Sequence, residues 1–203
     1  MNTLTAPLAL EDLSAQLSRY LGHFPQERAE LTLLATQLAE RDSGLLTRKH
    51  MRGHLTASAL VLNAALTHTL FIHHKASNFW MQPGGHYEDE ESLWSTAQRE
   101  VAEETGVGNI RLHPWHLQHD HPFDIHTHPI AARPAKGEDT HFHHDHLYLA
   151  IADSDTLALQ AEEIEGARWI PLSEIHYLSG DRITDRFVPK LKELGLMTLY
   201  QRP

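Results

Sequence analysis

Apolar residues recur every three or four positions between residues 8 and 46, with polar residues between them. This spacing is typical of helices that bury one face. Pro25 is suited to the first turn of a helix, and Glu27 and Glu30 favour the positive end of a helix dipole. The pattern therefore predicts two helices, which are separated near Gly22 and of which the second begins around Pro25.

The pattern changes beyond residue 50, where apolar and β-branched runs are bounded by short polar or proline- and glycine-containing connections. Such runs indicate strands. Helical spacing returns over residues 90–105 and 181–194, and this order of elements is typical of an α+β fold built in layers. We expect an N-terminal helical extension over residues 1–50 and a strand-rich domain over residues 51–203 with a closing helix. The predicted strands cover residues 55–63, 66–74, 123–130, 141–151 and 167–170.

The chain has 203 residues, of which 41% are hydrophobic, and this is enough for one substantial core. It contains no cysteine, which excludes disulfides, thiolate metal sites and cysteine nucleophiles. The net charge of −10 disfavours binding to a nucleic-acid backbone. No apolar run approaches the roughly 18 residues of a membrane span, and the N-terminus lacks a basic leader. We therefore expect a cytoplasmic protein without nucleic-acid or membrane partners.

One helical segment concentrates charge, because Arg99 is followed by Glu100, Glu103 and Glu104. Glutamates at positions i, i+3 and i+4 project from one helical face, where like charges repel. A divalent cation would reverse the sign of this interaction, and oxygen ligands of this type suit Mg²⁺ or Mn²⁺ together with substrate phosphates. The alternative is a solvated helix face without a function.

The surrounding sequence favours the metal interpretation. From Gly85 onward it reads GHYEDEESLWSTAQREVAEETGV, in which Gly85, Glu91, Arg99 and the three glutamates are followed by Gly106. This resembles the Nudix box, G-x5-E-x7-R-E-U-x-E-E-x-G-U with U an aliphatic residue, at every specified position. The resemblance implies a mixed β-sheet between α-helices, with the box as a loop, a helix and a second loop.

The resemblance also implies a role for each residue of the box. Glu100, Glu103 and Glu104 would ligate the cation, with Glu103 as a ligand or as a base. Arg99 would orient a neighbouring glutamate through a charge-assisted hydrogen bond. The motif residues Gly85, Glu91 and Gly106 would be structural: Gly85 permits a tight turn, Glu91 fixes the loop before the helix, and Gly106 ends the helix in a left-handed conformation.

The implied activity is attack of water on phosphorus in a small diphosphate, of the form nucleoside diphosphate linked to a second group. A further carboxylate outside the box is expected in such enzymes, and Glu162 and Glu163, followed by Glu165, are candidates unless they only solubilise a loop. The alternative function is a nucleotide-binding sensor that does not cleave its ligand. An isomerase of isopentenyl diphosphate, which shares the fold, is excluded by the absence of cysteine. The N-terminal helices would act as a lid, a packing element or a homodimer contact.

The chain also contains 18 histidines, which is far above ordinary usage. On the two strands predicted over residues 123–130 and 141–151, His126 and His128 share one face, as do His141 and His143. A hairpin would bring the pairs together as a Zn²⁺ site, as a polar substrate pocket, or as surface histidines without a role. Trp80, just before the box, would stack on a nucleobase or pack in the core.

Overall fold

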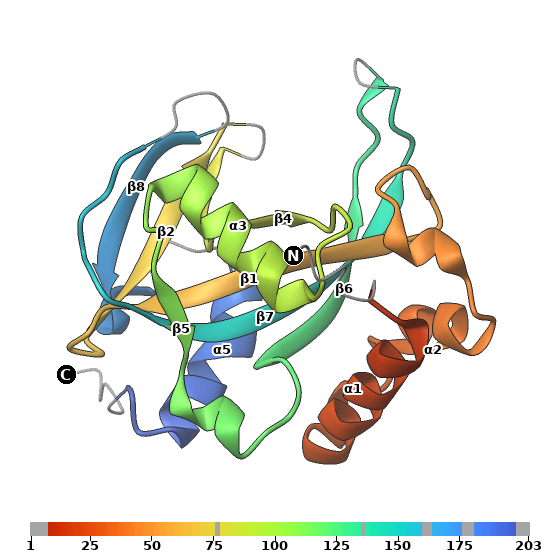
Figure 1. Cartoon of the computed structure of the whole chain (residues 1–203), viewed down its shortest axis with the longest axis horizontal. Helices are drawn as coiled ribbons and strands as arrows, with labels where there is room; N and C mark the ends of the chain where they lie inside the picture. Colours follow the sequence, from red (N-terminus) through yellow and green to blue (C-terminus); the bar gives the residue numbers. More distant parts are fainter. Residues whose placement is uncertain (1–7, 76–77, 135–136, 160–163, 176–180, 198–203) are drawn as a thin grey trace, which may run out of the picture. The chain divides into compact units, whose positions relative to one another are not determined.

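The computed structural model describes residues 8–75, 78–134, 137–159, 164–175 and 181–197. Its described residues form two compact units. Figure 1 shows the helices and strands coloured in sequence order. The first unit draws on Met1–Ser58, Gly84–Ala97 and Pro114–Tyr148, and the second on Ala59–Pro83, Gln98–His113 and Leu149–Pro203. Strands β1 (His54–Leu62) and β7 (His141–Ala152) and helix α3 (Leu93–Thr105) contribute residues to both units.

The first unit begins with the helical extension. Helices α1 (Leu10–His23) and α2 (Thr32–Ala39) pack together and bury Leu13 and Leu34. The prediction that the second helix begins around Pro25 is wrong. Residues 25–27 form a 3-10 turn instead, because the amides of Arg28 and Glu30 bond to carbonyls three residues back rather than four. A second 3-10 turn covers Ser43–Leu46.

Two antiparallel pairings organise the rest of the first unit. The first part of β1 pairs with β4 (Gly84–His86), with Thr56 opposite His86. Strand β6 (Asp124–Ile130) pairs with β7, with His128 opposite His143. The predicted hairpin is therefore present. The tight turn expected at Gly85 is absent, because Gly84 and Gly85 lie in a strand and neither has a positive φ.

In the second unit, the strands follow the order β3-β2-β1-β7-β5, and β8 also pairs with β2. The long antiparallel β2–β8 ladder runs from His68 opposite Pro171 to His74 opposite Ile164. Helix α5 (Asp181–Glu193) closes the chain and buries Phe187 and Leu191, as its periodicity predicts. The remaining strands are β2 (His68–His74), β3 (Phe79–Met81), β5 (Ile110–Leu112) and β8 (Ile164–Pro171).

The fold is α+β with a mixed sheet and N-terminal helices before it, as expected. The apolar runs of β1 and β7 are buried almost throughout, as strands covered on both faces require. Among the helices that the structure describes, none has the length and apolar character needed to cross a bilayer.

Candidate active site and histidine cluster

Helix α3 presents the box glutamates because its opposite side is anchored in the protein. Leu93, Ala97 and Val101 recur at four-residue steps and are fully buried. The helix ends at Thr105, and Gly106 follows with φ of 74°. A Cβ on Gly106 would lie 2.6 Å from the carbonyl oxygen of Ala158, so both the conformation and the close approach require glycine.

Arg99 joins two of the three glutamates. Its Nη1 lies 2.9 Å from Oε1 of Glu100 and 2.9 Å from Oε2 of Glu103. The Glu100 side chain is largely covered, that of Glu103 is 54% exposed, and Glu104 is buried. One guanidinium leaves this group with a net negative charge. Carboxylate oxygens are the donors that Mg²⁺ and Mn²⁺ prefer, so these residue types on one helix fit the expected cation.

The glycines before the helix act differently from the expectation. Gly85 pairs with Ala57 across the β1–β4 ladder, so it does not form a tight turn. Close approach is instead required at Gly84, where a Cβ would lie 2.4 Å from the Cβ of Ser58 and 2.7 Å from the carbonyl oxygen of Ala57. Glu91 is exposed and lies at the N-terminal side of α3, where Ser95 Oγ donates to its Oε1 over a long 3.5 Å.

The β6–β7 hairpin brings the four predicted histidines into one row. The ring centroids of His126 and His128 lie 4.8 Å apart, those of His128 and His143 5.6 Å, and those of His141 and His143 5.1 Å. The register explains this row, because His128 lies directly opposite His143 and the other two follow at alternate positions.

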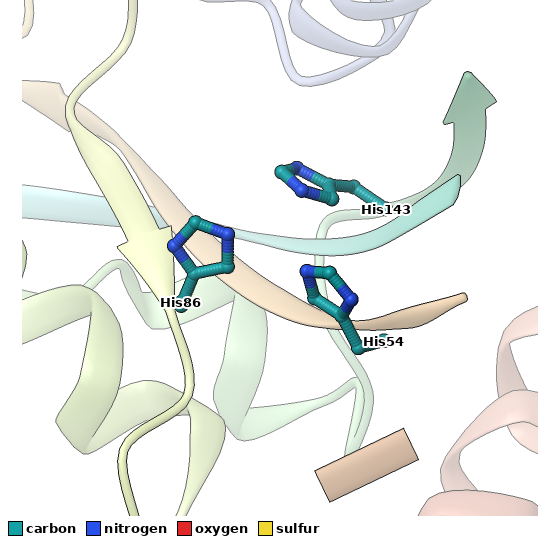
Figure 2. A group of neighbouring side chains, drawn as sticks. All are labelled: His54, His86 and His143. Atoms are coloured by element: carbon teal, nitrogen blue, oxygen red, sulfur yellow. The ribbon is translucent and has the colours of Figure 1, made fainter. Parts of the chain in front are cut away.

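Two further histidines, His54 and His86, complete a tighter group that sequence reasoning missed. Figure 2 shows the rings of His54 from β1, His86 from β4 and His143 from β7 turned toward one another. One potential ligand atom from each residue lies within 4.8 Å of those of the other two. Of the four histidines singled out in the sequence, only His143 belongs to this group. We call His54, His86 and His143 the histidine triad.

Burial disfavours the charged form of each imidazole in the triad. Burial lowers the pKa of His86 to about 3, and the positive charge of Arg48 acts in the same direction. Burial also lowers the pKa values of His143 and His54, and the neighbouring imidazoles lower these pKa values further. Neutral imidazoles keep a lone pair on one ring nitrogen, and this lone pair is what a metal ion requires.

Trp80 and the glutamates outside the box, also singled out in the sequence, belong neither to the α3 carboxylates nor to the histidine triad. The guanidinium of Arg168 lies 4.1 Å from the centroid of the Trp80 ring, and the His73 ring lies 5.2 Å from it. Part of the Trp80 ring is therefore covered by side chains of the protein itself. Glu162 and Glu163 lie outside the described residues. Glu165 is described, and its Oε2 lies 2.8 Å from Nδ1 of His73.

Comparison with known proteins agrees with this architecture. The curated relative Nudix hydrolase 6 from Arabidopsis thaliana is 26% identical over 71% of this chain, which spans about half (48%) of that relative's length. A C. elegans Ap4A hydrolase binary complex is similar in fold over 69% of this chain and 96% of that one, at 18% identity and a TM-score of 0.52.

A second solved structure of similar fold is the NUDIX domain of Shewanella oneidensis NrtR complexed with ADP ribose. The likeness covers 79% of this chain and 97% of that one, at 19% identity and a TM-score of 0.50. The family model of the NUDIX domain matches residues 52–191, which include the whole box and all three residues of the histidine triad. The chain therefore belongs to the Nudix family.

Proposed function

We propose that the protein hydrolyses a diphosphate bond in a small substrate of the form nucleoside diphosphate linked to a second group. The observation that carries this proposal is the set of carboxylates on α3, in which Arg99 Nη1 lies 2.9 Å from oxygens of both Glu100 and Glu103. Membership of the Nudix family supports it. An excess of clustered negative charge suits a cation-bridged polyanion better than an uncharged ligand.

Glu100, Glu103 and Glu104 would hold Mg²⁺ or Mn²⁺. When bound, such a cation lowers the pKa of the attacking water and balances negative charge on the phosphate oxygens. Arg99 keeps the carboxylates of Glu100 and Glu103 in fixed orientations through its two hydrogen bonds. The burial of Glu104 keeps its carboxylate in a region of low dielectric constant, where its attraction to a cation is strengthened.

The reaction itself is a displacement at phosphorus. The water oxygen forms a new bond to one phosphorus, the bond from that phosphorus to the bridging oxygen breaks, and the second phosphate leaves with the bridging oxygen. We propose that the Glu103 carboxylate accepts a proton from the attacking water, because its side chain is the most exposed of the three box glutamates. The products are a nucleoside monophosphate and a phosphorylated fragment.

The test is product release from a panel of nucleoside triphosphates, nucleotide sugars, dinucleoside polyphosphates and ADP-ribose, with Mg²⁺ or Mn²⁺ supplied. We expect Glu104→Gln to lower kcat/KM by at least about 100-fold, because it replaces a cation ligand with a neutral amide. Glu174→Gln is the matched control, since Glu174 is an exposed glutamate outside the box.

Two outcomes would overturn the proposal. Metal-dependent activity that survives in Glu104→Gln would show that the α3 carboxylates do not hold the cation. Tight nucleotide binding by calorimetry, with no turnover of any member of the panel, would identify a sensor rather than an enzyme.

A further inference from the structure

We propose that His54, His86 and His143 form a second metal site, which binds one imidazole-preferring transition-metal cation, Zn²⁺ foremost. All three candidate ligand atoms for the metal are imidazole nitrogens, and each comes from a different strand. The site uses none of the box carboxylates, so it stands independently of the proposed hydrolysis.

The spacing of the triad is suited to a small cation. Its potential ligand atoms all lie within 4.8 Å of one another. Tetrahedral Zn²⁺ with Zn–N bonds of about 2.0 to 2.1 Å separates its nitrogens by about 3.4 Å. Each ring therefore needs to move by about 1 Å or less, which rotation about the side-chain torsions supplies.

One nitrogen of the triad is buried without a hydrogen-bond partner. His54 is only 1% exposed, and among the described residues nothing bonds to its Nε2. Its Nδ1 lies 3.1 Å from the carbonyl oxygen of His50, which can only accept, so Nδ1 carries the proton and Nε2 the lone pair. A histidine that donates one N–H to a backbone carbonyl and turns its other nitrogen inward has the usual arrangement of a metal ligand.

Close backbone packing holds two of the ligands in place. His54 follows Gly53, where a Cβ would lie 2.6 Å from Nε2 of His144. The amide of Gln37 donates to the Gly53 carbonyl at 3.1 Å. His86 lies two residues after Gly84, whose own close approach to β1 was described above. The site is thus built on paired strands rather than on loops, which favours a defined ligand geometry.

Charge selects the kind of cation. The histidine triad contains no carboxylate, and imidazole nitrogens favour Zn²⁺ and similar ions over Mg²⁺, which prefers oxygen. With three imidazole ligands, the fourth position is left for water or an anion.

The first experiment uses the full wild-type chain, stripped of metal with a chelator. We expect calorimetry with Zn²⁺ to show one high-affinity cation per chain, resolved from weak binding by the other histidines. We expect Co²⁺ in the same site to give the intense visible absorption of four-coordinate cobalt. Only weak binding, or the pale spectrum of octahedral Co²⁺ in oxygen ligands, would overturn the proposal without any variant.

The second experiment compares variants. His86→Asn and His143→Asn should each weaken the high-affinity Zn²⁺ binding by at least about 100-fold. His113→Asn is the matched control, because His113 is a partly buried histidine whose pKa is also lowered by burial but which lies outside the triad. Circular dichroism establishes that each variant is folded. Unchanged Zn²⁺ affinity in folded His86→Asn and His143→Asn would refute the assignment.

A third comparison separates this site from the box. Glu104→Gln should retain the Zn²⁺ stoichiometry and the Co²⁺ spectrum of the wild type, whatever happens to its hydrolytic activity. If Glu104→Gln loses Zn²⁺ while His86→Asn keeps it, the cation is bound by the box and the triad is not a metal site.

Discussion

The Nε2 atoms of His141 and His143 lie 3.2 Å apart, within hydrogen-bond distance. Nδ1 of His141 lies 2.7 Å from the carbonyl oxygen of Asp139, so Nδ1 carries the proton and Nε2 of His141 is an acceptor. His143 must then donate through its Nε2, which leaves the lone pair on its Nδ1. His141 therefore orients a triad member without belonging to the triad.

This relationship predicts an effect of His141 on metal binding. We expect His141→Asn to weaken Zn²⁺ binding by about 10-fold, because orienting partners of metal ligands contribute 10- to 100-fold to affinity. Zinc calorimetry measures the change, with His113→Asn as the reference. A loss as complete as that in His143→Asn would instead make His141 a ligand, and no change would remove its orienting role.

Acid should destabilise the fold at a higher pH than carboxylate titration explains. Burial lowers the pKa of His144 to about 3 and that of His146 to about 4, whereas an unfolded histidine has a pKa near 6.5. The unfolded state therefore binds more protons as the pH falls below about 6.5, and the folded state is stabilised above that value. Each such histidine removes up to about 1.4 kcal/mol per pH unit between about 6.5 and its folded pKa.

Urea unfolding of metal-free protein at pH 7.5, 6.5, 5.5 and 5.0 tests this expectation. The free energy of unfolding should fall slightly between pH 7.5 and 6.5 and more steeply between pH 6.5 and 5.0. A stability that is constant down to pH 5.0 would show that these imidazoles are protonated in the folded state.

Asp145 and Ser58 should be strongly coupled in stability. The buried Asp145 carboxylate accepts hydrogen bonds from Ser58 Oγ at 2.5 Å and from Thr56 Oγ1 at 2.9 Å. A double-mutant cycle of Asp145→Asn and Ser58→Ala should give a coupling energy of about 1.5 to 3 kcal/mol. The exposed Arg41–Glu11 pair, at 2.6 Å, is the control and should give less than about 1 kcal/mol. Equal coupling in both pairs would contradict the role of burial.

Gly84→Ala should destabilise the protein. The added Cβ would meet the Ser58 side chain and the backbone of Ala57 closer than real contacts allow, so β4 must shift away from β1. We expect a loss of about 1 to 3 kcal/mol in chemical denaturation. At Gly108 an added Cβ meets nothing within 4 Å, so Gly108→Ala should change the free energy of unfolding by less than about 0.5 kcal/mol. Equal effects of the two substitutions would contradict the packing argument.

Arg99→Lys should lower the proposed hydrolytic activity even though it keeps the positive charge. A lysine ammonium does not reproduce the planar donor group whose Nη1 bonds to both Glu100 and Glu103. We expect kcat/KM to fall by about 10-fold or more at saturating Mg²⁺. Arg111→Lys, at an exposed position in β5, is the control. Full activity in Arg99→Lys would leave the guanidinium with no orienting role.

The sequence predicts the elements whose signal is local. The periodicity of α3, the apolar runs of β1 and β7, and the β6–β7 hairpin all agree with the structure. Strands β3, β4 and β5 have three residues each, which is too short to show a period. They form because longer neighbouring strands supply their hydrogen-bond partners.

The box glutamates and the histidine triad also differ in whether their signal in the sequence is local. The box glutamates lie within five residues of Arg99, so one helical turn brings them together and spacing alone identifies them. His54, His86 and His143 are distant in sequence, and only strand pairing makes them neighbours. His54 has no sequence pattern that marks it as a ligand. His86 carries a weak signal, since it follows the first glycine of the box.

Strand β4 links the box to the histidine triad, and this link restricts natural variation in the sequence. Its three residues contain both Gly85, which begins the box, and His86, and adjacent residues in a strand face opposite sides. One residue inserted between them would break the five-residue gap before Glu91 and would move the imidazole away from His54 and His143. Insertions and deletions should therefore be rare between these two positions across related genomes, even in lineages whose flanking loops differ in length.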